Sequence, residues 1–218
     1  VIQITGNPVE PVPLPRYFFA RMAKLTARNA PTGLVLVNLG TPDSPDVPQV
    51  RRYLKQFLSD PYVIDIPAAA RWLLVNGIIL RTRPRKSAEA YRKIFTERGS
   101  PLLFHTQDLT QGVKERLGPG TPVAFGMRYG NPSIESAARD LLKQGARRLV
   151  FVPLYPQFSY AASRSCEVEI ERVCAQLSAE GHSLETETLP EFPLEEGYLA
   201  SFETRCRETF AAFQPDHV

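Results

Sequence analysis

The stretch Gly33–Leu39, GLVLVNL, decides the fold class of this chain, because it is a short, almost unbroken apolar run that stops at Gly40. Such a run is typical of a strand that helices cover on both faces of a parallel sheet. Two similar runs occur at 123–127 and 148–154, each after a segment with helical spacing. Strands that alternate with helices over short links pair in parallel through right-handed crossovers. The sequence therefore predicts an α/β fold, a parallel sheet flanked by helices.

Helical spacing of apolar residues accounts for most of the chain outside these runs. We expect Asp46 to cap the first helix. The segment 46–117 between the first two strands is unusually long, and insertions of that size at strand ends usually carry function. The spacing predicts helices over 46–58, 87–95, 108–117, 132–144, 163–179 and 195–213, and a polar strand at 184–188.

Composition and charge exclude several classes of protein. The 218 residues are 43% hydrophobic and 22% charged, and 26 basic against 23 acidic residues leave a net charge of +3. This balance is typical of a globular protein and not of a disordered, collagen-like or disulfide-rich chain. A charge so mild and so evenly spread does not indicate a nucleic-acid partner. The three cysteines form no C-x-x-C motif, which favours a reducing compartment such as the cytoplasm.

The most apolar window of the chain is 66–80, IPAAARWLLVNGIIL, which Arg71 and Asn76 interrupt. No run of 18 apolar residues is present, so the sequence predicts no membrane-spanning helix. The window is either a plain core segment, which is the simpler interpretation, or a segment that lies on the surface.

The two ends of the chain lack the pattern of its middle. Residues 1–21 contain prolines at positions 8, 11, 13 and 15 and show no apolar period. We expect residues 1–32 to be a disordered leader and residues 33–218 to be the folded domain. The last residues, 213–218 (FQPDHV), resemble the turn that precedes another strand. We expect a longer protein to continue there, the alternative being a natural end at Val218.

Polar and aromatic side chains follow each of the three predicted strands, at 38–42 (NLGTP), 126–132 (GMRYGNP) and 153–159 (PLYPQFS). In an open parallel sheet, ligands bind beyond the carboxyl ends of the strands. Each segment taken alone is as consistent with an ordinary turn as with a site. Arg128 and Tyr129, however, are costly to bury without an anionic or planar partner. Together the three strand ends favour a flat, amphiphilic ligand.

The helical insertion contains two further candidate features. Residues 81–86 (RTRPRK) place four cations beside the apolar window. They are either a solvated helix start or a set of guanidinium groups that bind carboxylates of a hydrophobic ligand. Residues 99–101 (GSP) predict a tight turn that presents the hydroxyl of Ser100.

Ordinary catalytic and metal-binding motifs are absent from the sequence. None of G-x-G-x-x-G, G-x-x-x-x-G-K-[ST], G-x-S-x-G and H-E-x-x-H occurs. His105, His182 and His217 lie near no cysteine or carboxylate at ligand spacing, and we expect the first two to be exposed. We predict no metal site and no resident cofactor. The residues alone indicate an α/β domain with a rim for a planar ligand that carries carboxylates.

Six ordered segments together resemble the N-terminal half of the ferrochelatases, above all those of Gram-negative bacteria. The likeness runs almost without gaps from residue 33 to residue 159 and more loosely to residue 218. It implies a Rossmann-like chelatase lobe, the first of two, and insertion of Fe(II) into a porphyrin (protoporphyrin IX or coproporphyrin) in the last step of haem synthesis. The segments are LVNLGTPDSP (36–45), VRRYLKQFLSDPYVIDIP (50–67), NGIILRTRPRKSAEAYRKI (76–94), GSPLLFHTQ (99–107), MRYGNPSIESA (127–137) and VPLYPQFS (152–159).

The resemblance also implies roles for individual segments and residues. Residues 39–42 would lie against the macrocycle, and residues 66–80 with their basic continuation would form a pocket lip. That lip would place a cytoplasmic protein at the periphery of the inner membrane. The other partners would be porphyrin, ferrous iron and the second chelatase lobe, with no cofactor required. The residues that match porphyrin-site positions of the family are Leu39, Gly40, Thr41, Pro42, Arg81, Tyr91, Ser100, Arg128, Tyr129, Tyr155 and Ser159.

The sequence departs from the family pattern at two places. After the position of Ser159 the family has a small residue and then Ser-Thr-Thr-Gly or a close variant, whereas residues 160–164 here are YAASR. The essential His of the family and its partner Glu lie beyond a strand that would begin at about residues 217–218. We therefore expect no catalytic residue in this chain and no activity from it alone. The alternative is a non-catalytic half-chelatase that binds porphyrin or acts as an interaction module.

Overall fold

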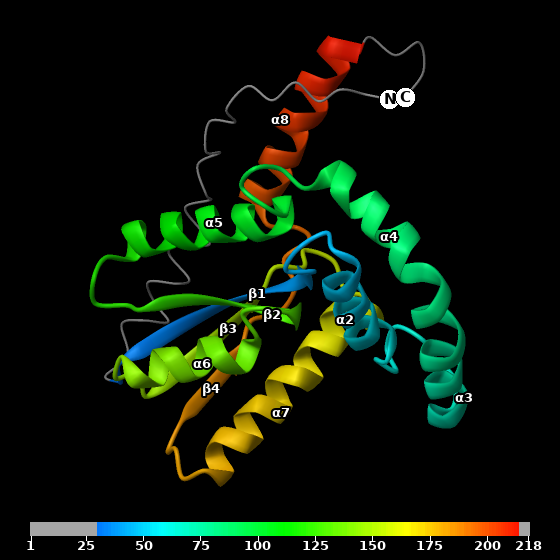
Figure 1. The fold of residues 1–218 in the computed structure, drawn as a ribbon. Helices are drawn as coiled ribbons and strands as arrows, with labels where there is room; N and C mark the ends of the chain where they lie inside the picture. Colours follow the sequence, from blue (N-terminus) through cyan, green and yellow to red (C-terminus); the bar gives the residue numbers. More distant parts are fainter. Residues whose placement is uncertain (1–29, 214–218) are drawn as a thin grey trace.

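The computed structural model describes residues 30–213. The expectations for residues 1–29 and 214–218 lie outside this described part, but the leader was expected to extend to residue 32, and Thr32 is instead a buried residue that begins the first strand. The described chain is an α/β domain (Figure 1). Its strands are β1 (Thr32–Thr41), β2 (Val123–Gly130), β3 (Arg148–Pro153) and β4 (Glu185–Thr188). Its helices are α2 (Val47–Leu58), α3 (Ala68–Leu73), α4 (Leu80–Ile94), α5 (Pro101–Leu117), α6 (Ile134–Lys143), α7 (Ser165–Ala179) and α8 (Glu196–Phe213), with two π-helical segments, η1 (Leu74–Ile79) and η2 (Tyr160–Arg164).

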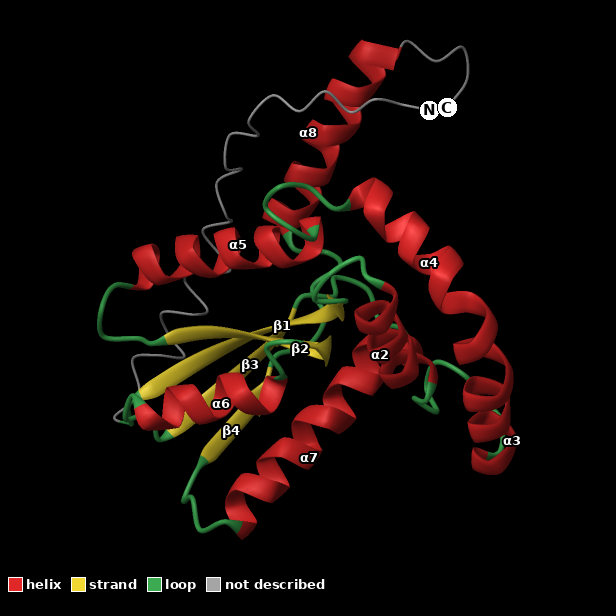
Figure 2. Ribbon diagram, viewed as in Figure 1, coloured by secondary structure: helices red, strands yellow, loops and turns green. Residues whose placement is uncertain are grey.

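The four strands form one parallel sheet in the order β2-β1-β3-β4 (Figure 2). β1 is central: Leu34 lies opposite Val123 of β2 and opposite Val150 of β3. The prediction of a parallel sheet built around 33–39, 123–127 and 148–154 is therefore confirmed. The strand after each helix returns to the same sheet, as right-handed crossovers require.

Helices cover both faces of the sheet, which explains the unbroken apolar run of β1. Val35 and Val37 face a core cluster with apolar residues of α6 and α7. Leu34 and Leu36 face the opposite cluster, which α5 completes through Val113. All four β1 side chains are fully buried. In Figure 1, α5 lies on one side of the strands while α6 and α7 lie on the other.

The helical insertion packs at the carboxyl ends of the strands through a third core cluster. α2 contributes Val50, Tyr53 and Leu54 to this cluster, and the η1–α4 segment contributes Val75, Leu80 and Ala88. The sheet contributes Tyr129, a fully buried residue near the end of β2. The insertion is thus anchored at the sheet edge where a ligand site is expected.

Two insertion helices begin earlier than their apolar spacing predicts. α4 starts at Leu80 rather than at residue 87, and it contains Pro84. A proline normally disturbs the preceding helical turn, but here that turn adjoins the π-helical segment η1, where the regular hydrogen-bond ladder is already altered. α5 starts at Pro101 rather than at residue 108, because proline suits the first turn of a helix.

The expected cap of α2 forms only in part. Asp46 occupies the N-cap position, but its side chain makes no capping hydrogen bond. Its Oδ2 instead accepts a hydrogen bond from the hydroxyl of Ser44, at 2.8 Å. The carboxylate of Asp46 is thus hydrogen-bonded to the loop that precedes α2, and not to the backbone N–H groups of the first helical turn.

The window 66–80 lies on the surface, so the interpretation as a plain core segment is wrong. Trp72, Leu73 and Ile78 are 66%, 62% and 57% exposed. Val75 and Leu80 are buried and attach the segment to the third cluster. The mean hydropathy of the window does not show that only these two of its residues are buried.

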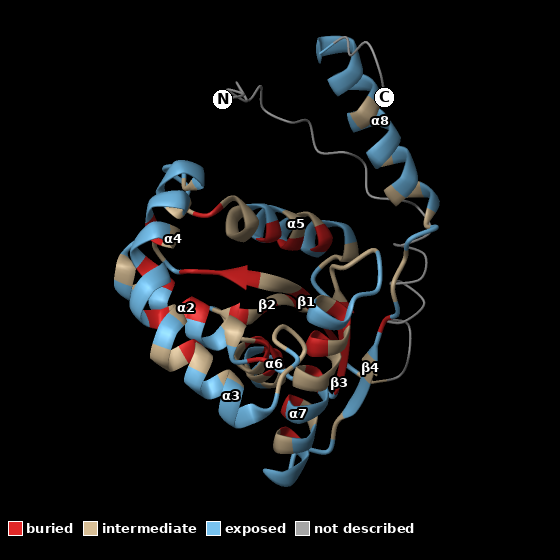
Figure 3. Ribbon diagram, turned by 90° about the vertical axis from the view of Figure 1, so that its right-hand side faces the viewer, coloured by how far each residue is buried: buried red, intermediate tan, exposed pale blue. Residues whose placement is uncertain are grey.

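The last helix, α8, extends away from the rest of the domain and has no buried residue (Figure 3). Large apolar side chains are nevertheless exposed along it, among them Phe202 at 62% and Phe213 at 71%. An apolar face of this kind is typical of a surface that another protein segment covers.

Candidate functional site

The carboxyl ends of β1, β2 and β3 meet at one edge of the sheet. Thr41 at the end of β1 lies opposite Gly130 at the end of β2. Val37 lies opposite Pro153 at the end of β3, two residues before Tyr155. The structure therefore brings the three predicted strand-end segments to the same rim, beneath the helical insertion.

Two glycines at this rim are required by the close approach of β1 to β2. Gly40 has a φ of +105°, and a Cβ there would lie 1.7 Å from the carbonyl oxygen of Tyr129. Gly130 has a φ of +90°, and its Cβ would lie 2.7 Å from the carbonyl oxygen of Thr41. The position that a side chain would occupy at Gly40 thus faces the neighbouring strand and not a ligand cavity. Thr41, only 5% exposed, and Pro42 are also buried.

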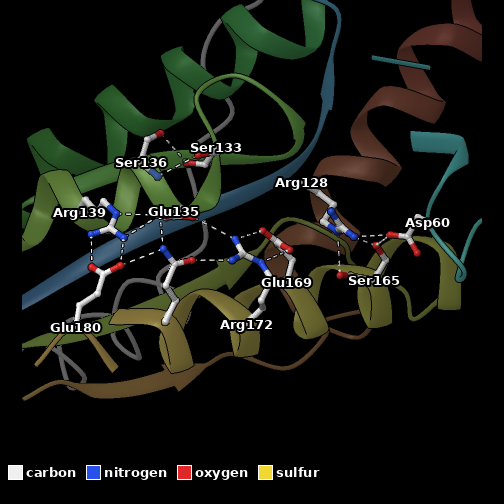
Figure 4. Close-up of polar contacts among 11 residues, drawn as sticks. Asp60, Arg128, Ser133, Glu135, Ser136, Arg139, Ser165, Glu169, Arg172 and Glu180 are labelled. Carbon is white, nitrogen blue, oxygen red and sulfur yellow. Dashed lines mark hydrogen bonds and ion pairs between the residues drawn. The ribbon is translucent and has the colours of Figure 1, made fainter. Parts of the chain in front are cut away.

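A buried polar cluster joins the rim to the insertion and to α7 (Figure 4). Asp60, which follows α2, forms an ion pair with Arg128 of β2, and the two side chains are only 2% and 15% exposed. Asp60 Oδ2 also accepts hydrogen bonds from the hydroxyls of Tyr129, at 2.8 Å, and Ser165, at 2.6 Å. Asp60 Oδ1 accepts the backbone N–H of Tyr62, at 2.8 Å. Every oxygen of this buried carboxylate is therefore paired.

The electrostatics of the cluster follow from these contacts. Burial alone would raise the pKa of Asp60, but the hydrogen bonds from Ser165, Tyr62 and Tyr129 and the charge of Arg128 outweigh it and hold that pKa below its ordinary value. Burial also raises the pKa of Tyr129, so this phenol stays protonated. The cluster is therefore an ionised carboxylate surrounded by donors.

The guanidinium of Arg128 is held on three sides. Its Nε donates to the carbonyl oxygen and to Oγ of Ser165, at 3.0 and 2.8 Å. Its Nη2 donates to Asp60, and its Cζ lies 4.5 Å from the ring centroid of Tyr129, in a cation–π contact. Within residues 30–213, Nη1 has no partner. The structure thus places Arg128 in an internal ion pair with one edge of the guanidinium left over.

Tyr155 lies beside this cluster with its polar atom unused. The hydroxyl oxygen is buried, and no residue of the described chain hydrogen-bonds to it. Its ring packs on the core cluster formed with α6 and α7. Burial raises the pKa of Tyr155 and outweighs the charge of Arg128, which acts to lower it, so Tyr155 stays a neutral phenol. A buried hydroxyl without a partner is rare in folded proteins and calls for an explanation.

Aromatic rings connect Tyr91 of α4 to the same rim. Tyr91 and Tyr53 make an edge-to-face contact, with centroids 6.2 Å apart. Tyr53 stacks on Phe57, which in turn meets Tyr129 edge to face at 5.1 Å. Burial raises the pKa values of Tyr53 and Tyr91. These rings form an apolar wall above the strand ends, suited to a planar ligand.

Three other predicted site residues lie apart from the polar cluster. Arg81 is exposed and lines a surface groove between α2 and α4, together with Arg51 and Lys55. Ser100 precedes α5 and is 4% exposed, so its hydroxyl is not presented to solvent. Ser159 is exposed and its Oγ accepts the backbone N–H of Ala162, at 3.1 Å.

Arg164 is the cation of residues 160–164, where the sequence departs from the family pattern, and it is paired within the chain. Arg164 Nη1 forms ion pairs with Glu167, at 2.9 Å, and Glu171, at 3.3 Å. Both partners belong to the first turns of α7. The side chain therefore stabilises the η2–α7 junction.

Sequence reasoning missed Asp60 and Ser165, the two residues that complete the polar cluster. Asp60 stands in a polar stretch after an amphipathic helix, and Ser165 stands at a helix start, so both match ordinary surface positions. No local pattern marks them, because their partners are 68 and 105 residues away in the chain. Asp60 lies within one of the segments that resemble the family, whereas Ser165 lies beyond the last of them, which ends at residue 159.

The described residues contain neither a metal-ligand cluster nor a membrane-spanning helix. Among residues 30–213, no group of three or more His, Cys, Asp or Glu side chains is placed to hold a metal ion. His105 and His182 are exposed, as predicted. No helix within the same residues is long and apolar enough to cross a membrane.

Comparison with known proteins identifies the family. The model of the ferrochelatase family matches residues 31–218. A ferrochelatase of Coxiella burnetii (strain CbuK_Q154) is 43% identical over 199 residues, which are 90% of this chain and 54% of the relative. Those of Chromobacterium violaceum and Teredinibacter turnerae are 45% and 49% identical, over 81% and 64% of this chain and 49% and 39% of the relatives. The chain thus spans about half the length of the curated relatives it matches. The match covers nearly all of the described residues, which form an α/β lobe whose strand ends and helical insertion meet at one rim. The chain therefore belongs to the ferrochelatase family.

Proposed function

We propose that this chain forms one wall of the porphyrin site of a ferrochelatase, an enzyme that inserts Fe(II) into a porphyrin during haem synthesis. The observation that carries the proposal is the rim itself. There an aromatic wall from the insertion and the buried Arg128–Asp60 pair meet the unpaired hydroxyl of Tyr155. A flat ligand with an apolar face and polar edges fits such a combination. Family membership supplies the porphyrin, protoporphyrin IX or coproporphyrin, as the candidate.

The residues of this chain suit binding and orientation of a macrocycle. The rings of Tyr91 and Phe57 offer apolar faces, and Tyr155 offers a hydroxyl that lacks a protein partner. Metal insertion also requires a group that accepts two pyrrole protons, for which neutral imidazole is suited near pH 7. His105 and His182 are exposed, and we assign neither of them this task. We propose that the proton acceptor comes from the second chelatase lobe.

The second lobe is also the partner we propose for α8. Phe202, Phe210 and Phe213 are 62%, 43% and 71% exposed along this helix. The relatives are about twice as long as the matched region, so a second lobe of the same family is a partner of suitable size. Burying these rings would remove apolar surface from water.

The surface segment 66–80 supports the proposed contact with a membrane. Trp72, Leu73 and Ile78 are exposed, and Arg81 and Arg83 follow them on α4. Exposed aromatic and aliphatic side chains beside cations are typical of proteins that bind an anionic membrane surface. We propose a cytoplasmic protein held at the periphery of the inner membrane by this lip.

Porphyrin binding by the purified chain tests the proposal. Trp72 is the single tryptophan, so its fluorescence reports binding at the lip without interference, and porphyrin absorbance provides a second signal. We expect saturable binding of deuteroporphyrin IX, a water-tolerant dicarboxylate porphyrin. No binding at micromolar concentrations would contradict the proposed wall.

Metal insertion distinguishes the enzymatic reading from a non-catalytic half-chelatase. Fe(II) or Zn(II) is added to the chain and porphyrin, with and without the C-terminal half of the Coxiella burnetii relative, and metalloporphyrin absorbance is followed. We expect rapid insertion only when the second half is present. Insertion by the chain alone would place the proton acceptor within residues 1–218, and binding without insertion in either mixture would favour the binding module.

A further inference from the structure

We infer that Asp60 is a positioning residue of the candidate site, which fixes the guanidinium of Arg128 in the orientation that a ligand at the rim would meet. The inference rests on the proposed function for the identity of the ligand, but the placement of Arg128 by Asp60 stands on geometry alone. Core packing alone gives no reason for a charged pair at these two positions, because two apolar side chains would fill the same space without the free-energy cost of burying charge.

The first step is the isolation of Asp60 from solvent. Its carboxylate is 2% exposed and accepts four donors, from Arg128, Tyr129, Ser165 and the backbone of Tyr62. A buried carboxylate with this many donors is rigidly oriented, since any rotation leaves a donor unpaired in a dry environment. Asp60 therefore acts as a fixed anchor for the side chains around it.

The second step is the position of Asp60 in the chain. It belongs to the turn after α2, in the helical insertion, while Arg128 and Tyr129 end β2 and Ser165 begins α7. One carboxylate thus joins α7, which packs in the cluster of β1 and α6, to the insertion and β2, which share the third cluster. The insertion and the strand ends are fixed relative to each other at this point.

The third step is what Asp60 leaves of Arg128. Nε and Nη2 are committed to Ser165 and Asp60, and the guanidinium lies over the ring of Tyr129. The edge without a partner in the described chain is Nη1, and the side chain retains 15% exposure. A ligand carboxylate or carbonyl would therefore meet one oriented N–H edge of a charge-balanced pair, instead of a mobile cation.

Removing the charge of Asp60 separates this positioning role from simple electrostatic attraction. The variant Asp60→Asn preserves the shape of the side chain but turns its NH2 group toward donors, so Arg128 should leave its place. It also adds one net positive charge near the rim. Attraction alone predicts tighter binding of a dicarboxylate porphyrin, whereas positioning predicts binding weaker by about tenfold or more.

The experiment uses the full 218-residue chain and the probe deuteroporphyrin IX. Affinities are compared for the parent, Asp60→Asn, Arg128→Met and the double variant, with Asp108→Asn as a matched loss of a carboxylate charge at an exposed ion pair on α5. We expect Asp60→Asn to weaken binding in the parent but to have little further effect in the Arg128→Met background. Additive losses, or tighter binding by Asp60→Asn, would overturn the inference.

A second measurement does not depend on porphyrin. The Nε–H proton of Arg128, buried and doubly hydrogen-bonded, should exchange slowly with water in ¹⁵N NMR spectra, and its signal is assigned by its loss in Arg128→Met. We expect rapid exchange in Asp60→Asn and no change in Asp108→Asn. Unchanged exchange in Asp60→Asn refutes the positioning role, whereas changed exchange in a chain that binds no porphyrin supports it and refutes the proposed function.

Discussion

The hydroxyl of Tyr155 should lower the stability of this chain, so that Tyr155→Phe makes the protein more stable. The oxygen is buried without a partner in the described chain, and the ring packs on the core cluster of β1, α6 and α7. An unpaired buried hydroxyl costs about 1–3 kcal/mol. Phenylalanine keeps the ring packing and removes that cost, so the free energy of unfolding should rise by about 1 kcal/mol, the low end of the range.

Tyr129→Phe is the matched control, because it makes the same chemical change at the neighbouring strand end. The hydroxyl of Tyr129 lies 2.8 Å from Asp60 Oδ2 and 2.9 Å from Ser165 Oγ. Hydrogen bonds to charged groups contribute about 1.5–3 kcal/mol. This variant should therefore lose stability, and the two Tyr→Phe variants should differ by about 3 kcal/mol with opposite signs.

Urea unfolding followed by far-UV circular dichroism measures both changes. In a chain of this size, each kcal/mol corresponds to a Tm shift of about 2–4 °C, so thermal melts provide an independent check. A loss of stability in Tyr155→Phe as large as that in Tyr129→Phe would refute the reasoning, since it would mean that the Tyr155 hydroxyl is paired in the folded protein.

If Tyr155 contributes its hydroxyl to a porphyrin, Tyr155→Phe should also weaken deuteroporphyrin binding several-fold, and unchanged affinity would remove Tyr155 from the proposed contacts.

Gly40→Ala should prevent folding, because φ is +105° and the added Cβ would lie 1.7 Å from a carbonyl oxygen of β2. The control Gly112→Ala, in open space on α5, should raise the free energy of unfolding by up to about 1 kcal/mol. Equal soluble yields and melting temperatures for the two variants would contradict this prediction. The pKa of Asp60 is lowered by folding, so its stabilisation is complete above about pH 4 and is lost as the pH falls through the lower folded-state value. Asp60→Asn should flatten the acid limb of a plot of unfolding free energy against pH, and an acid limb identical to that of the parent would refute this. Glu187→Ala removes an ion-pair partner of Arg148, a 2% exposed residue at the start of β3, and should lower the free energy of unfolding by about 1–3 kcal/mol. Glu185→Ala, which removes a 71% exposed carboxylate near the same arginine, should lower it by no more than about 1 kcal/mol. Similar losses in both variants would show that burial does not set the strength of this pair.

The sequence by itself determined the architecture of the sheet. Leu34, Val35, Leu36 and Val37 form a continuous apolar run, and only a strand covered on both faces buries all four, which the structure confirms. Alternation of such runs with helical spacing then requires parallel pairing, and parallel pairing brings the strand ends to one rim. These conclusions depend on local periodicity and on chain connectivity, both of which can be read from consecutive residues.

The extents of the insertion helices and the exposure of residues 66–80 depended on tertiary packing. The average hydropathy of residues 66–80 favours a core segment, yet only Val75 and Leu80 of this window are buried. Apolar spacing predicts a helix start at residue 87, yet α4 begins at Leu80 and continues through Pro84. In both cases the surrounding elements decide which side of the helix is covered, and a single-segment pattern contains no information about those neighbours.

The polar cluster was decided by the tertiary structure alone. Asp60, Arg128 and Ser165 come from segments separated by 68 and 37 residues, and each has the local signature of an ordinary turn or helix end. The free energy that selects this arrangement is the cost of leaving a buried charge or hydroxyl unpaired, and that cost arises only once the segments have met and excluded water. Periodicity therefore predicts where the rim lies, whereas the pairing of its charges, and the unpaired hydroxyl of Tyr155, follow from long-range burial.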